Sequence, residues 1–129
     1  MTGLHSALII VGNQQLSITM SRPNDLVQGT LNLLILKVLA LGPRHGWAIA
    51  QRLQQMSKDV LQVGQGSLYP ALHKLEHQGW IESAWVEAES GRPTKVYSLT
   101  AEGRRALKRE SEQWQRLSTA ITGVVKARG

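Results

Sequence analysis

The sequence predicts a mainly α-helical fold with one small β-hairpin, followed by a long C-terminal helix. Three observations lead to this prediction. Apolar residues recur at helical spacing in four stretches, apolar and polar residues mix at strand-like spacing in two short stretches around residue 90, and Gly or Pro stands at most boundaries. Three helices and a hairpin in this order are the layout of a winged helix-turn-helix, which we expect over residues 25–99.

Composition limits the class of protein. With 129 residues the chain is expected to form a single compact unit with a modest core. Fifteen Lys and Arg against nine Asp and Glu give a net charge of +6, which suits a polyanionic partner. The chain has no cysteine, so disulfides and thiolate sites are excluded. The apolar run 7–11 is too short to span a membrane, and we expect a cytoplasmic protein associated with the nucleoid.

Residues 1–24 show no sustained periodicity, and we expect them to form a flexible arm. The first helix is predicted over 25–41, where Gly42-Pro43 ends it. A second helix is predicted over 46–56, and residues 57–64 connect it to the next element.

A third helix is predicted over 66–78, with Gly79 as its C-terminal stop. Its inward-facing residues are Leu68, Ala71, Leu72 and Leu75. Pro70 is expected in the first turn, where a missing N–H costs little because that donor has no partner within the helix.

Two strands are predicted after this helix, joined by the loop 88–94. The first contains Trp80, Ile81, Trp85 and Val86, and the second contains Val96, Tyr97 and Leu99. Trp47, Trp80 and Trp85 are expected to pack in the core or on the hairpin.

The last helix is predicted over 101–125, with Thr100 as its N-cap. Apolar residues follow a heptad pattern along this helix, interrupted at one position by Glu110. The apolar residues of the pattern are Leu107, Trp114, Leu117, Ile121 and Val124. A helix this long cannot bury such a seam along its whole length on so small a body. We therefore expect residues 100–129 to be a dimerisation helix that packs against a second copy.

Three sequence blocks resemble the PadR family of bacterial transcriptional regulators. They are GTLNLLILKVLALGPRHGWAIAQRL, GSLYPALHKLEHQGWI and GRPTKVYSLTAEGRRAL, and the resemblance spans about residues 25–125. It implies a homodimeric, repressor-type regulator with the helix 66–78 in the DNA major groove and the C-terminal helix at the dimer interface. It carries no catalytic residues over to this chain.

The candidate DNA-binding residues lie on the third helix and on the hairpin tip. They are Gln65, Ser67, Tyr69, Pro70, His73, Lys74, Arg92, Thr94 and Lys95. Polar side chains near a helix N-terminus suit phosphate, and basic hairpin tips suit the flanking backbone. Other interpretations stay open: Tyr69 packing against the second helix, Lys74 as a solvated surface residue, and a hairpin tip that only aids solubility. The expected partner is double-stranded DNA. Because a dimer presents two recognition helices related by two-fold symmetry, we expect its operator to be palindromic.

Trp114 has two interpretations. It is a space-filling residue of the dimer interface, or, as the resemblance implies, it helps to enclose a flat aromatic effector between two subunits.

Other chemistry is disfavoured. His73 and His77 match the spacing of a zinc-binding H-x-x-E-H motif, but the helix is short and no acidic third ligand follows. No nucleophile elbow or phosphate-binding glycine loop is present, so we expect neither an enzyme nor a cofactor. The alternative function is a winged-helix module that binds proteins without reading specific DNA.

Overall fold

The computed structural model describes residues 18–19 and 25–129. Its helices are α2 (Asp25–Ala40), α3 (Gly46–Met56), α4 (Gln65–His77) and α5 (Ala101–Val125). Its strands are β1 (Ile18–Thr19), β2 (Arg44–His45), β3 (Leu61–Gln62), β4 (Ile81–Glu87) and β5 (Pro93–Leu99). The four predicted helices and the hairpin are confirmed within one or two residues. The predicted flexible arm lies outside the described residues, apart from β1.

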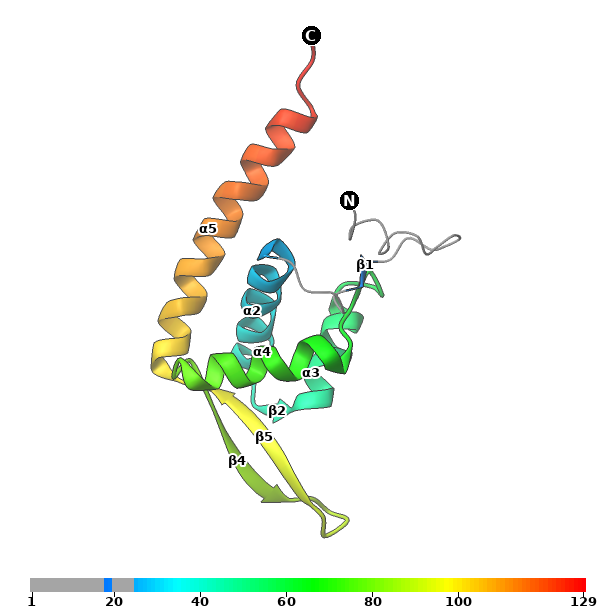
Figure 1. The fold of residues 1–129 in the computed structure, drawn as a ribbon, viewed down its shortest axis with the longest axis vertical. Coiled ribbons are helices and arrows are strands. Elements are labelled where there is room, and N and C mark those ends of the chain that lie inside the picture. The colour runs from blue at the N-terminus through cyan, green and yellow to red at the C-terminus, as the bar shows by residue number, and fades with distance from the viewer. Residues whose placement is uncertain (1–17, 20–24) are drawn as a thin grey trace.

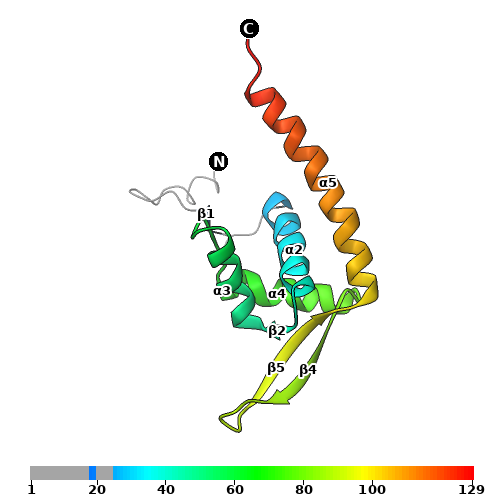
Figure 2. The ribbon, with the colours of Figure 1, turned by 180° about the vertical axis from the view of Figure 1, so that it is seen from behind.

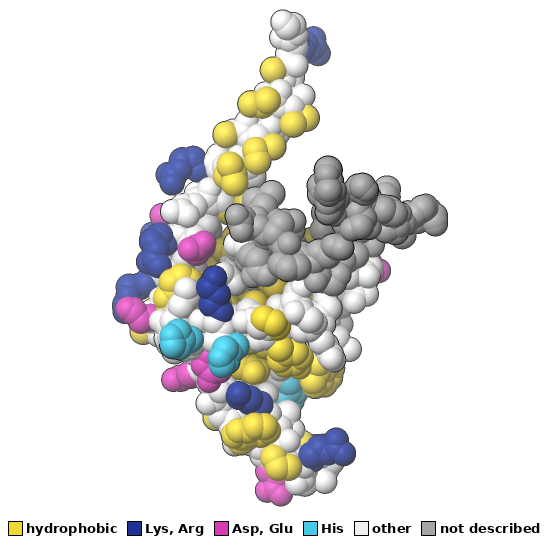
Figure 3. Space-filling view, viewed as in Figure 1, with side chains coloured by type: hydrophobic (Ala, Val, Ile, Leu, Met, Phe, Trp, Pro, Cys, Tyr) yellow, Lys and Arg dark blue, Asp and Glu magenta, His cyan; other side chains and the backbone are white. Residues whose placement is uncertain are grey.

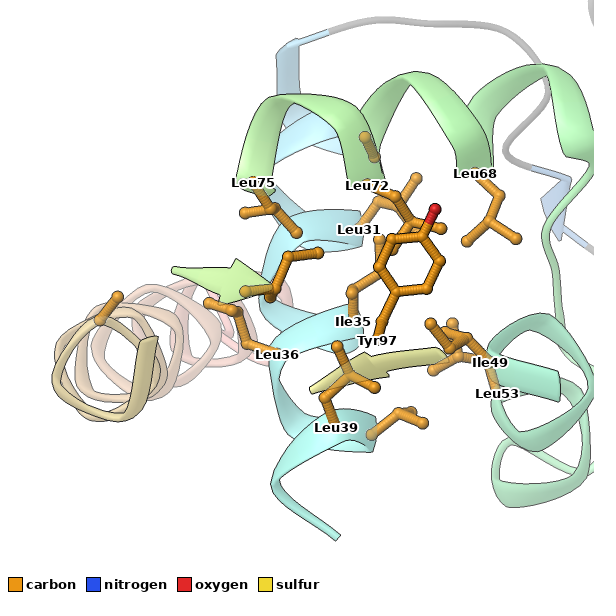
Figure 4. Close-up of a cluster of buried hydrophobic side chains, with 14 residues drawn as sticks. Leu31, Ile35, Leu36, Leu39, Ile49, Leu53, Leu68, Leu72, Leu75 and Tyr97 are labelled. Atoms are coloured by element: carbon orange, nitrogen blue, oxygen red, sulfur yellow. The ribbon is translucent and has the colours of Figure 1, made fainter. Parts of the chain in front are cut away.

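The core lies where α2 meets α3, α4 and the body end of the hairpin (Figures 1 and 4). Helix α2 crosses the centre, and its buried side chains are Leu31, Ile35, Leu36, Val38 and Leu39. Helix α4 adds its predicted inward face, and Tyr97 of β5 lies among these leucines (Figure 4). Burial of these apolar side chains is the main force that holds the three helices and the hairpin together.

The hairpin belongs to a three-stranded antiparallel sheet in the order β2-β5-β4. In β4 and β5, Ile81 pairs with Leu99 near the body, and Glu87 pairs with Pro93 near the tip. Strand β2 pairs Arg44 with Tyr97 on the other edge of β5. This two-residue strand was not predicted, because two residues are too few to show an alternating pattern.

A tight junction fixes the start of α5 against the end of α4. The Thr100 hydroxyl donates to the Gly79 carbonyl oxygen at 2.7 Å and accepts from the Gly103 amide at 2.9 Å, so the predicted N-cap is confirmed. A Cβ atom at Gly103 would lie 2.0 Å from the Trp80 carbonyl oxygen. Only glycine lets the first turn of α5 approach so closely.

The later turns of α5 extend away from the body, and the hairpin projects from the opposite end (Figures 1 and 2). Gly103 and Ala106 are buried, and Leu107 packs against the core of its own chain. From Trp114 onward the apolar side chains are exposed. Of the five residues of the predicted seam, Leu107 is therefore packed against its own chain, and the other four remain accessible to a partner.

Candidate nucleic-acid interface

Helix α4 has one buried and one exposed side. Its leucines face the core, while Gln65, His73, Lys74 and His77 are exposed. Ser67 is the exception among the candidate DNA-binding residues: it is only 5% exposed and lies on the buried side, so, contrary to what that role requires, it does not face outward. A hydroxyl is small enough to fit beside the core, and the helical period places position 67 next to Leu68 and Ala71 on that side.

Pro70 lies in the second turn of α4 rather than in the first, because the helix begins at Gln65. The Pro70 nitrogen carries no hydrogen, so the Gly66 carbonyl oxygen lacks its usual donor four residues on. Pro70 is itself exposed. The prediction that Pro70 lies in the first turn, where its missing N–H would cost little, is therefore wrong.

Tyr69 both packs against α3 and remains accessible. A Cβ atom at Gly46 would lie 2.9 Å from the Tyr69 ring and from its hydroxyl oxygen, so the ring covers the first residue of α3. The side chain is nevertheless 40% exposed. The predicted packing interpretation thus describes a real contact, and that contact leaves the hydroxyl beside the N-terminus of α3. That helix has no side-chain N-cap and no acidic residue in its first turn.

The hairpin tip is a tight turn that carries one exposed cation. The Ala88 amide donates to the Arg92 carbonyl oxygen at 3.0 Å, and the Gly91 amide donates to the Ala88 carbonyl oxygen at 2.8 Å. Gly91 has a φ of 85°, a conformation that favours glycine. Arg92 is exposed, and the Thr94 hydroxyl donates to the Arg92 carbonyl oxygen at 3.3 Å. These bonds define the shape of the turn that presents Arg92.

Lys95 lies nearer the body, over two aromatic rings. Its Nζ is 5.9 Å from the centre of the Trp85 ring and 5.7 Å from the centre of the Tyr97 ring. Both distances are within the range of cation–π attraction. The ammonium group is therefore held on one face of the hairpin.

A hydrogen bond ties the hairpin to α4. The Ser83 hydroxyl donates to a carboxylate oxygen of Glu76 at 2.6 Å. Burial raises the pKa of Tyr97 above its usual 10.0, and electrostatic interaction with Glu76, and then with Tyr69, adds to the rise. Tyr97 therefore remains neutral beside this carboxylate at physiological pH.

These groups share one face of the molecule. Figure 3 shows histidine and Lys or Arg side chains over α4, and hydrophobic, Lys or Arg, and Asp or Glu side chains over the hairpin on the same side. Lys74 is the cation of α4, and Arg92 and Lys95 are the cations of the hairpin, which also carries three glutamates. The structure thus brings the exposed predicted residues of the helix and the basic residues of the hairpin onto a common surface, and it leaves Ser67 out.

A second feature lies between α2 and α5. A groove of about 160 Å³ is lined by Gly29, Thr30, Leu33, Glu110, Gln113, Trp114 and Leu117. Trp114 is therefore accessible, and a carboxylate stands one turn before it on the same helix. The groove is smaller than the roughly 300–1,000 Å³ of most small-molecule pockets.

The chain matches the model of the PadR-like family of transcriptional regulators over residues 35–109, which is more than half of its length. The chain belongs to this family. Solved structures agree with the match. A transcriptional regulator from Clostridium thermocellum is 26% identical with a TM-score of 0.73, covering 80% of this chain and 100% of its own.

A PadR family regulator from Eggerthella lenta is 31% identical with a TM-score of 0.68, over 78% of this chain and 86% of its own. A transcriptional regulator of Mycobacterium tuberculosis is 34% identical over 70 residues, which cover 54% of this chain and 64% of that relative. The predicted winged-helix fold and family are therefore confirmed. PadR-like proteins are transcriptional regulators rather than enzymes.

Within the part of the chain that the structure describes, no helix is long and apolar enough to cross a bilayer. Across residues 18–19 and 25–129, no three His, Cys, Asp or Glu side chains gather in a way that would hold a metal ion.

Sequence reasoning missed two features of this PadR-like surface. Trp85 was expected to pack on the hairpin, yet it is 68% exposed, and Trp47 is 53% exposed rather than buried. Trp80 does pack against the core. The Glu76–Ser83 bond was not foreseen either, although both residues flank the Gly79 stop. The signal that could have indicated this bond is the presence of two polar residues seven positions apart on either side of the helix end.

Proposed function

We propose that this chain is a homodimeric PadR-type repressor that binds a palindromic operator on the bacterial nucleoid. One observation carries the proposal: the side of the hairpin that carries Lys95 is the side that bonds to α4, whose exposed side carries Lys74. Exposed Arg92 lies at the hairpin tip. A helix of this kind enters the major groove, while the hairpin follows the adjacent backbone. On this view Gln65, Tyr69, Pro70, His73 and Thr94 complete the contact surface.

Dimerisation through α5 is the second part of the proposal. Trp114, Leu117, Ile121 and Val124 are between 41% and 77% exposed, which is costly for apolar side chains in water. They lie at heptad spacing, as in helices that pack in pairs. A second copy would cover them and would also set the distance between two α4 helices.

Release by a flat aromatic molecule is the third part. The groove beside Trp114 offers an indole face, and Glu110 and Gln113 offer polar groups. Its small volume supports a site that a second subunit completes. Titration with a planar cationic dye should quench tryptophan fluorescence and weaken DNA binding, and a Trp114→Ala variant should lose both responses. Unchanged fluorescence would contradict this part alone.

Fluorescence anisotropy with labelled duplex DNA tests the DNA-binding proposal. Log affinity should fall steeply with log salt, and Lys74→Gln should lower that slope by about one for each phosphate that the lysine neutralises. Lys126→Gln, at the far end of α5, is the matched control and should leave the slope unchanged. A flat salt response would instead favour the protein-binding alternative.

A further inference from the structure

Trp85 is the most exposed aromatic side chain in the described part of the chain. It is 68% exposed, compared with 53% for Trp47 and 41% for Trp114. An indole is the largest apolar group that a side chain offers, and such groups are enriched where proteins contact partners. Its exposure therefore calls for a partner of defined chemistry.

The sheet register places Trp85 on the side of the hairpin that faces α4. Trp85 pairs with Lys95, and Ser83 pairs with Tyr97 two pairs nearer the body. Residues two apart on a strand share a face, and the Ser83 hydroxyl on that face bonds to Glu76 of α4. Trp85 therefore lies on the same face of the hairpin as the contact with α4, but further from the body. Val86 points to the other side of the hairpin.

The cation held on the Trp85 ring favours a polyanion over an apolar protein partner. Lys95 holds its ammonium above the indole, and exposed Arg92 lies at the tip. Glu76 is engaged with Ser83, while Glu87 lies two pairs further out, opposite Pro93, and Glu89 is exposed in the turn. The positive charge nearest the indole is therefore the Lys95 ammonium.

We propose that Trp85 is a DNA-contacting residue whose indole packs on deoxyribose rings of the strand that borders the groove occupied by α4. The contact rests on the proposed DNA-binding function and adds to it a non-ionic component. Sugar rings offer C–H groups to an indole face, and the neighbouring phosphates would meet the Lys95 ammonium. Because every nucleotide carries the same sugar, this contact strengthens binding without choosing a sequence.

The experiment measures anisotropy at several salt concentrations with two duplexes, one selected from a random library and one of scrambled sequence. The variants are Trp85→Ala, Trp85→Phe, Lys95→Gln and the control Val86→Ala on the opposite face of the same strand. Circular dichroism and the unfolding midpoint confirm that each variant is folded. An exposed position such as 85 tolerates truncation with little change in stability.

The proposal expects Trp85→Ala to bind both duplexes about tenfold more weakly, with an unchanged salt slope. Trp85→Phe should retain most of the affinity and Val86→Ala all of it. Lys95→Gln should instead lower the slope by about one unit for each phosphate that the ammonium neutralises.

Three results would overturn the proposal. Wild-type affinity in Trp85→Ala would show that the indole does not touch DNA, and a reduced salt slope in that variant would show that it merely positions Lys95. Weaker binding of the selected duplex alone would indicate base contact rather than sugar contact. If the wild-type protein binds neither duplex, the DNA-binding function itself fails, and the two failures are thus distinguishable.

Discussion

Helices α4 and α5 are both amphipathic, yet their exposed sides differ in chemistry. In α4 the apolar side is buried by the same chain, and the exposed side carries Lys74 and two histidines. In α5 the chain buries only the first turns, and the exposed later turns carry apolar side chains. An exposed basic side suits a polyanion, whereas an exposed apolar seam suits another protein surface. The difference supports two separate partners, DNA for α4 and a second copy for α5.

The junction between the two helices makes these roles interdependent. Thr100 bonds to the end of α4 and to the first turn of α5, and Gly103 lies against the Trp80 carbonyl. A change in the angle of α5 would therefore move α4. On the proposed function, this junction transmits the dimer geometry to the spacing of the two DNA-reading helices.

The largest expected effect is at this junction. Gly103→Ala would bring Cβ to 2.0 Å from the Trp80 carbonyl oxygen and 2.7 Å from Leu99 Cδ1. Because backbone cannot move aside easily, we expect a loss of about 3 kcal/mol or more in the free energy of unfolding. Urea denaturation measures it.

Gly123→Ala is the matched control, since no atom lies within 4 Å of a Cβ there. It should stabilise the helix by up to about 1 kcal/mol. Equal stability of the two variants would show that the close approach at Gly103 does not constrain the fold.

The next effect concerns the apolar side of α5. Ile121→Glu places a charge in the proposed seam, and we expect dimer association to weaken by about 100-fold or more. Sedimentation equilibrium should show the mass falling from twice the 14.2 kDa chain mass to that of one chain. Thr119→Glu, an exposed change on the opposite side of the helix, should leave the dimer intact. If the wild-type protein has the mass of one chain, the proposal that α5 packs against a second copy is wrong.

A smaller effect is expected where α4 meets the hairpin. Ser83→Ala removes the donor to Glu76 and should lower the free energy of unfolding by about 1 kcal/mol. In a double-mutant cycle with Glu76→Gln, we expect a coupling energy of at least about 0.5 kcal/mol. Additive effects would mean that the bond contributes nothing to the position of the hairpin.

The smallest effect is at alkaline pH. The folded-state pKa of Tyr97 is raised above 10.0, so folding disfavours its ionisation. The stability contribution of the neutral form is complete below pH 10 and is lost as the pH rises through the folded-state pKa. Wild-type stability should therefore fall more steeply above pH 10 than that of Tyr97→Phe. Parallel stability curves would contradict the burial of this hydroxyl next to Glu76.

Apolar spacing was enough to predict the four helices, the hairpin and the N-cap at Thr100, because these depend on local periodicity and capping. Side-chain exposure at the ends of elements was harder to predict. Ser67 lies on the side of α4 that packs against the core, which the helical period beside Leu68 and Ala71 could have indicated. Trp85 is exposed because the hairpin extends beyond the body, and this depends on the three-dimensional arrangement of elements, which local sequence patterns do not encode.

Selection of bound DNA from a random library tests the central claim most directly. Two α4 helices held by an α5 dimer should enrich an inverted repeat whose half-sites are centred about one duplex turn apart, roughly 34 Å. Ile121→Glu should lose that enrichment while retaining its fold. Enrichment of a single unpaired half-site, or of no sequence at all, would contradict a dimeric sequence-reading regulator.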